Sequence, residues 1–234
     1  MYTRTTDSAK ENHWKRLHGK QKIQYVWDYY KLPITVCLIF LYVIGYMVYG
    51  HFTKKDIVLY TGLVNVSAGE QLTSELSRGF LDSMDTSISR TDLKLYTGLY
   101  LTDDPEGGNR EYAYASRIKI LASIDNEQLD IVIMNREAFD LFSQSGYLYN
   151  MEELLKNPNT GTVAEWTPYL VISPVTQKDP AGDMPTEDYP TGLRLSQNKL
   201  FVKAGFEDDL YLGVIKNTPR MDTVIEYIKY LYFR

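Results

Sequence analysis

Histidine and cysteine are nearly absent from this chain of 234 residues. The single cysteine is Cys37, and the three histidines are His13, His18 and His51. Residues 53–234 therefore lack the side chains needed for a Ser-His-Asp triad, a Cys-His dyad or a thiolate or imidazole zinc site. They also have no cysteine that could form a disulfide. We expect a protein that is not an enzyme and that carries no cofactor.

Other motifs of catalysis and metal binding are also missing. Neither a Walker loop nor a G-x-G-x-x-G fingerprint occurs. Ser116 and Lys119 have the spacing of S-x-x-K, but they lie in a helical pattern without companion motifs, so chance explains them better. Two groups of acidic residues lack the ligand spacing of a known calcium loop. The first is Asp103, Asp104 and Glu106, and the second is Asp179, Asp183, Glu187 and Asp188. We interpret both groups as solvated loops and expect no metal; paired carboxylates for glycoside hydrolysis stay an open alternative.

Charged residues are absent from LPITVCLIFLYVIGYMVYGHF, residues 32–52. A helix of this length spans about 31 Å, close to the hydrocarbon thickness of a bilayer. The sequence therefore predicts a transmembrane helix over residues 32–52 that contacts the lipid bilayer, with Pro33 in its first turn. The alternative is a buried core helix of a soluble protein, but such helices seldom run this long without a polar face.

Basic residues are concentrated before this segment, where seven stand against three acidic residues. The positive-inside rule then places residues 1–31 in the cytoplasm and residues 53–234 outside, in a single-pass protein of the cell membrane. A cleaved signal peptide is the rival interpretation. We expect retention instead, because the leading segment and the apolar run are both longer than those of ordinary signal peptides.

Residues 53–234 are acidic. They hold 27 of the 30 acidic residues but only 18 of the 25 basic ones, so their formal net charge is −9. This balance argues against nucleic acid as a partner. A segment of about 180 residues is long enough for one ordinary core but short for two full lobes.

Strand and helix patterns alternate in this segment. Residues 56–66, 92–100 and 129–134 are apolar or alternating and rich in β-branched side chains, which predicts strands. A helical pattern follows each of them. Three such repeats indicate an α/β fold, namely one three-layer domain with a mainly parallel sheet and right-handed crossovers.

The first two helices are predicted from caps and apolar faces. Ser67 and Glu70 have the spacing of a capping box that opens the first helix. Its expected buried stripe is Leu72, Leu76, Phe80 and Met84. The second helix covers residues 110–124, and its expected apolar face is Tyr114, Ile118, Leu121 and Ile124.

The third helix has the clearest ends. Asn135 is expected to cap a helix over residues 136–146, which Gly146 ends. Asn150 is expected to start a short helix after it.

Beyond residue 157 the pattern is weaker. Strands are expected at residues 169–175 and 210–216, separated by a Pro- and Asp-rich loop over residues 176–192. Asn217, Thr218 and Pro219 are expected to cap a final helix, with Pro219 at its first position.

Two segments resemble bacterial extracellular solute-binding proteins of ABC importers. In residues 129–155 the likeness rests on Asp130, Gly146, Leu148 and the run Met151–Leu155; in residues 210–232 it rests on a strand ending near Asn217 before a helix. The resemblance implies one periplasmic-binding-protein-like lobe. Proteins of that family have two lobes and are secreted or lipid-anchored, so the chain would be a truncated, membrane-anchored relative.

Polar residues that follow neighbouring strands are the candidate ligand-binding groups: Asn65, Ser67, Asn135 and Arg136. Open α/β sheets bind ligands at the carboxyl ends of their strands, and free N–H groups at helix N-termini attract anions. If the strand order is 2-1-3, these residues meet at one edge. We expect a non-catalytic binding module for a small solute or a partner protein. The alternative is an accessory subunit of a membrane complex such as a transporter.

Overall fold

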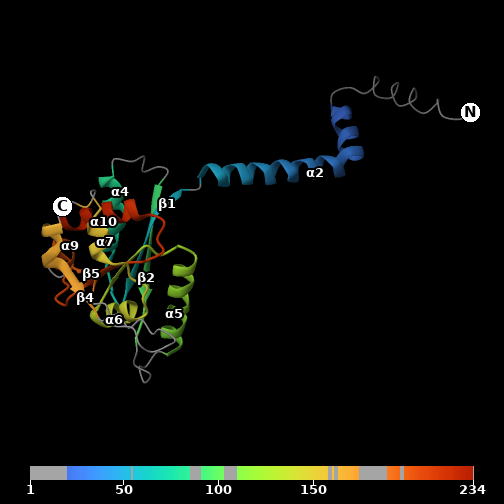
Figure 1. Cartoon of the computed structure of the whole chain (residues 1–234). Coiled ribbons are helices and arrows are strands. Elements are labelled where there is room, and N and C mark those ends of the chain that lie inside the picture. Colours follow the sequence, from blue (N-terminus) through green and yellow to red (C-terminus); the bar gives the residue numbers. More distant parts are fainter. Residues whose placement is uncertain are drawn as a thin grey trace, which may run out of the picture. The chain divides into compact units, whose positions relative to one another are not determined.

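The structure is a computed structural model that describes residues 20–53, 55–84, 91–102, 110–157, 160, 163–173, 189–195 and 198–233. The contacts within it divide the chain into two compact units, Met1–Lys54 and Lys55–Arg234, and Figure 1 shows the elements of both. The seven acidic residues interpreted as solvated loops, at positions 103, 104, 106, 179, 183, 187 and 188, lie outside the described residues.

The first unit contains one long helix, α2 (Lys20–Thr53). It begins well before the predicted start at residue 32, so Pro33 lies inside the helix and not in its first turn. The segment Lys31–Gly50 has a mean hydropathy of 2.1, and none of it is buried. In the described part of the chain, α2 is the one helix long and apolar enough to cross a membrane, although a signal sequence has the same properties.

The second unit is built on a six-stranded sheet in the order β2-β1-β3-β6-β5-β4. The strands are β1 (Asp56–Val64), β2 (Thr91–Leu99), β3 (Ile131–Met134), β4 (Leu170–Ile172), β5 (Pro190–Arg194) and β6 (Tyr211–Val214). The β2-β1-β3 half is parallel, as the strand–helix repeats predict. The other three pairings are antiparallel, so the expectation of a mainly parallel sheet is wrong. The strands β3 and β6 run in opposite directions, yet every residue of both is buried. An apolar run in the sequence therefore does not reveal the direction of a strand.

Helices cover both faces of this sheet (Figure 1). On one face lie the continuous helical segment α3 (Glu70–Ser74), η1 (Glu75–Gly79) and α4 (Phe80–Ser83), and the final helix α10 (Met221–Phe233). On the other face lie α5 (Arg110–Asp125) and α6 (Arg136–Gln144). Alternate residues of β3 belong to different cores. Ile131 and Ile133 pack in the core of the first face, and Val132 and Met134 pack in the core of the second. The domain is therefore a mixed α/β fold with two apolar cores.

The helix ends agree with the sequence in the middle of the domain and disagree at two places. Asn135 caps α6 as expected, and Gly146 follows α6 with a φ of 71°. Ser67 does not cap α3: the helix begins at Glu70 behind Gly69, without a side-chain cap, so the capping-box prediction is wrong.

The final helix begins later than predicted. Its first residue is Met221 and not Pro219, because the Thr218 hydroxyl accepts a hydrogen bond from the Arg220 N–H at 3.1 Å in the turn before it. The first helical hydrogen bond runs from the Val224 N–H to the Arg220 carbonyl.

Helix α5 buries only part of the expected face: Ile124 is buried and Leu121 is half-buried. Ser116, Ile120 and Ile124 are buried, whereas Tyr114 is 69% and Ile118 49% exposed. The buried residues recur every four positions and point to the sheet, so positions 114 and 118 lie on the opposite side of the helix. Because Ser116 is buried and Lys119 is exposed, the S-x-x-K match has no structural counterpart.

The second half contains elements that the sequence did not predict. Asn150 caps the expected short helix α7 (Met151–Leu155). The unpredicted elements are α8 (Val163–Trp166), η3 (Thr167–Tyr169), β5 and α9 (Lys199–Lys203). The first residues of β5 fall in the segment interpreted as a loop over residues 176–192. The described part of the domain thus has a larger antiparallel half than expected.

Candidate binding site

Two predicted site residues meet at the carboxyl edge of the parallel strands. Asn65 follows β1 and Asn135 follows β3, and the Asn65 Nδ2 donates to the Asn135 Oδ1 at 3.2 Å. The strand order β2-β1-β3 brings them together. Asn65 has a φ of 58°, a left-handed conformation that asparagine tolerates better than most residues.

The amide groups of these two residues are used within the protein. The Asn65 Nδ2 also donates to the Leu101 carbonyl at 2.6 Å, and its Oδ1 accepts from the Leu101 N–H at 2.9 Å. The Asn135 Oδ1 accepts from the Ala138 N–H at 3.0 Å. Both side chains thus join the ends of β1, β2 and β3 to α6. Ligand binding by either of them stays a prediction.

Arg136 is the more accessible group of this edge, with a side chain that is 51% exposed. Its Nε donates to the Asp140 Oδ2 at 2.8 Å, and its guanidinium lies 5.6 Å from the ring centroid of Tyr211. The Asp140 Oδ1 accepts from the Ser173 hydroxyl at 2.8 Å. The hydrogen bond with Asp140 is the main reason that the pKa of Arg136 is raised. Ser67 is exposed in the coil before α3, and ligand binding by Ser67 and Arg136 also stays a prediction.

A cavity of about 650 Å³ lies beside the C-terminal end of α10. It is lined by Glu75, Tyr169, Asn198, Lys199, Leu200, Leu231, Tyr232 and Phe233. The Tyr232 hydroxyl donates to the Arg194 carbonyl at 2.6 Å, and Arg194 pairs with Tyr211, which pairs with Met134 at the end of β3. This end of α10 therefore lies at the same edge of the sheet as the end of β3.

Aromatic rings form one wall of this cavity. The Tyr232 ring centroid lies 4.8 Å from that of Tyr169 and 5.3 Å from that of Trp166, and the Phe233 ring lies 5.1 Å from Trp166. The Trp166 Nε1 donates to the Thr160 carbonyl at 3.0 Å, which fixes the indole. Burial, and secondarily the neighbouring Tyr169, raises the pKa of Tyr232. The aromatic C-terminal run of residues 227–233 is a weak sequence signal for this wall, because the same pattern also predicts an ordinary helix.

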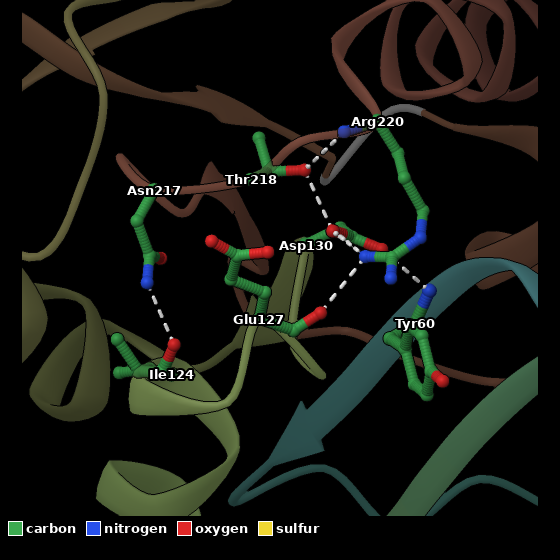
Figure 2. Close-up of polar contacts among 7 residues, drawn as sticks. All are labelled: Tyr60, Ile124, Glu127, Asp130, Asn217, Thr218 and Arg220. Atoms are coloured by element: carbon green, nitrogen blue, oxygen red, sulfur yellow. Dashed lines mark hydrogen bonds and ion pairs between the residues drawn. The ribbon is translucent and has the colours of Figure 1, made fainter.

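At the opposite edge of the sheet, a buried carboxylate is fully engaged (Figure 2). Asp130 has no exposed surface. Its Oδ2 accepts from the Tyr60 N–H at 2.8 Å, and its Oδ1 accepts from the Thr218 hydroxyl at 2.6 Å and from the Arg220 Nη1 at 2.9 Å.

Arg220 closes this cluster. Its Nη1 also donates to the Glu127 carbonyl at 2.8 Å, and the guanidinium lies 4.7 Å from the Tyr60 ring centroid. The cluster ties β1, the start of β3 and the turn before α10 together. Because its polar groups satisfy one another, we assign it a structural role.

No described group of three or more histidine, cysteine, aspartate or glutamate side chains has an arrangement that could hold a metal ion. No family model, curated protein or solved structure matches this chain. The resemblance to solute-binding proteins therefore stays a prediction from the sequence.

Proposed function

We propose that this chain is a membrane-anchored, non-catalytic binding module whose folded domain lies outside the cytoplasm and binds a small solute or a partner protein. The observation that carries the proposal is α2: its apolar segment Lys31–Gly50 has no buried residue and needs an apolar environment. Its basic leading segment favours a cytoplasmic N-terminus.

The domain offers a place for a ligand at the carboxyl edge of its sheet. Ligand pockets in proteins commonly measure about 300–1,000 Å³ and combine apolar walls with a few polar groups. The cavity beside α10, at about 650 Å³, falls in this range. Residues 53–234 have no histidine or cysteine, which favours binding over nucleophilic or zinc-dependent catalysis.

A lobe related to solute-binding proteins is the form that we propose for this module. The motifs of residues 129–155 and the parallel β2-β1-β3 half, with helices on both faces, support it. Asn65, Ser67, Asn135 and Arg136 then lie where such a lobe faces a ligand or a second body.

A second candidate, an accessory subunit of a membrane complex, rests on the outer surface of α5. Tyr114 and Ile118 are exposed there, and a cavity of about 330 Å³ lies between α5 and α6. That cavity is lined mostly by apolar side chains, together with Arg117 and Ser145. Exposed apolar surface next to a groove is typical of protein–protein contacts.

The membrane part of the proposal is tested by cell fractionation. The full chain should stay in the membrane pellet after an alkaline carbonate wash. A variant with Leu41→Arg and Ile44→Arg places two charges in the bilayer at a cost of about 2.5–3.5 kcal/mol each and should move to the soluble fraction. The matched control, Leu41→Val and Ile44→Val, should stay in the pellet. A wild-type chain released by the wash would refute the anchor.

The binding part is tested with the full chain in lipid nanodiscs. Calorimetric titration with pools of sugars, amino acids and short peptides detects solute capture, and crosslinking in intact membranes detects a protein partner. Heat exchange with one pool, or one crosslinked neighbour lost on Ile118→Glu but kept on Val202→Glu, supports a binding module. The absence of both signals would refute the binding module. Val202 is the control because it is exposed to a similar degree on α9.

A further inference from the structure

The side of α5 that faces away from the sheet carries an apolar stripe. Tyr114, Ile118 and Leu121 follow one another at spacings of four and three residues, which places them on one face of the helix. Tyr114 and Ile118 are exposed, and Leu121 is half-buried. The stripe is therefore apolar surface in contact with water, and covering it with another body is favourable.

The spacing of this stripe suits a second helix. Apolar residues separated by four and then three positions form the seam along which two helices pack with interlocking side chains. Leu121 also lines the cavity between α5 and α6, together with Leu141 and Phe142 of α6. A helix laid along the stripe thus meets α5 along its length and, at Leu121, the apolar wall of this cavity.

Charges on the same side of α5 make the helix complementary to a second copy of itself. Arg117 lies one turn before Leu121, and Asp125 lies one turn after it; both are exposed. When two copies of α5 pack antiparallel, with Ile118 of each opposite Leu121 of the other, Arg117 comes within one turn of Asp125 of the second copy. A parallel pair would place each charge beside the same charge of the second copy, which is unfavourable.

The small size of the stripe favours a second copy over a soluble partner. Stable complexes of soluble proteins bury about 800 Å² per partner, more than one face of a helix of this length supplies. A second copy carries its own α2, whose apolar segment holds it in the same membrane. Confinement to one membrane raises the effective concentration, so a weaker contact is enough.

We infer that α5 is a self-association surface through which two copies of this chain pair antiparallel. Ile118 packs on Leu121 of the second copy, and Tyr114 extends the apolar contact towards both ends of the pair. Arg117 forms an ion pair with Asp125 of the second copy. This inference rests on the proposed function, in which α5 contacts a neighbour in the membrane, and it names that neighbour.

Disulfide crosslinking in isolated membranes tests the antiparallel register. Cys37→Ser removes the one cysteine of the full chain. Two differently tagged chains, one with Ile118→Cys and the other with Leu121→Cys, are co-expressed and oxidised with copper phenanthroline. We expect at least about fivefold more mixed dimer than from two tagged chains that both carry Val202→Cys, because a disulfide forms only between cysteines held close together. Val202 is exposed on α9 and controls for random collisions.

Charge reversal tests whether the neighbour is a second copy. Arg117→Glu and Asp125→Lys should each lower the yield of the 118–121 dimer about threefold, because each places like charges together across the contact. Both substitutions in one chain should restore the yield, since the ion pair forms again with its signs exchanged. The two positions lie about 12 Å apart along one helix, so they do not compensate for each other within a chain.

Three results would overturn the inference. The first is a 118–121 dimer no more abundant than the Val202→Cys dimer. The second is a larger yield from two chains that both carry Ile118→Cys than from the 118–121 combination, which indicates a parallel pair. The third is a doubly charge-reversed chain that crosslinks no better than the single variants.

The failure of this inference differs from the failure of the proposed function. A chain that fails these tests but exchanges heat with a solute, or crosslinks through α5 to a different protein, is still a binding module. A chain that gives the 118–121 dimer but is released from the membrane by the carbonate wash keeps the α5 contact and contradicts the anchor.

Discussion

Asp130 and Arg220 form the most buried ion pair among the described residues. The Asp130 side chain has no exposed surface, and that of Arg220 is 25% exposed. Removing one partner of a buried pair leaves an uncompensated charge, which costs about 3–5 kcal/mol. Arg220→Met should therefore lower the Tm of the domain by about 6–20 °C.

Thermal unfolding of the full chain in detergent, followed by near-ultraviolet circular dichroism, measures this effect. Adding Asp130→Asn to Arg220→Met should recover part of the loss, because a neutral amide needs no cation. Arg117→Met, at an exposed position of α5, is the control and should change the Tm by no more than about 2 °C. Equal Tm values for Arg220→Met and Arg117→Met would contradict a structural role for the cluster.

Two buried tyrosines make stability depend on alkaline pH. Burial raises the pKa of Tyr227 and of Tyr232 above the ordinary value of 10.0. The unfolded chain therefore ionises first, so the stability contribution is complete below pH 10 and is lost as pH rises above it. Above pH 10, each of these groups lowers the free energy of unfolding by at most about 1.4 kcal/mol per pH unit.

The free energy of unfolding from urea titrations, measured between about pH 8 and pH 11, tests this expectation. Tyr232→Phe should flatten the alkaline loss, whereas Tyr114→Phe, at an exposed position, should leave it as steep as in the wild type. An unchanged slope in Tyr232→Phe would show that other groups control the alkaline limit.

At the scale of elements, η1 is a π-helical turn within the first helix of the domain. The Tyr227 hydroxyl donates to the Leu76 carbonyl at 3.0 Å, and the Tyr230 hydroxyl donates to the Glu75 carbonyl at 2.8 Å. Two carbonyls of the π turn thus have side-chain partners from α10. We conclude that α10 stabilises this irregular turn.

Tyr227→Phe and Tyr230→Phe should each cost about 1–2 kcal/mol, because each leaves a carbonyl without its donor while the packing of the ring is kept. The urea midpoint of the full chain measures the loss. Tyr114→Phe removes an exposed hydroxyl and serves as the control. Two variants as stable as this control would show that water satisfies the carbonyls equally well.

The elements differ in how far the sequence predicts them. The strands β1, β2 and β3 and the helix α6 are recognisable because apolar runs, Asn135 and Gly146 give local signals. β5 is missed because it is short, begins with Pro190 and contains Gly192. That glycine is required by packing: a Cβ there would lie 2.5 Å from the Phe139 Cε2. Such contacts join distant segments and leave no local pattern.

The candidate site follows the same rule at the scale of the whole molecule. Asn65 and Asn135 were predictable as neighbours, because parallel strands place their carboxyl ends together. The cavity beside α10 was not, because it combines η1, η3, α9 and α10, and α9 was not recognised. Its lining spans positions 75 to 233, a distance in sequence over which periodicity says nothing.

The central claim is that α2 holds the domain outside the cytoplasmic membrane, and cysteine labelling in intact cells tests it most directly. Cys37→Ser gives a cysteine-free chain, into which Ser67→Cys or Ser8→Cys is introduced. We predict that S67C reacts with a membrane-impermeant maleimide in intact cells, that S8C reacts only after permeabilisation, and that both chains keep full length. Reaction of S8C but not S67C in intact cells, or a shortened chain, would contradict the account.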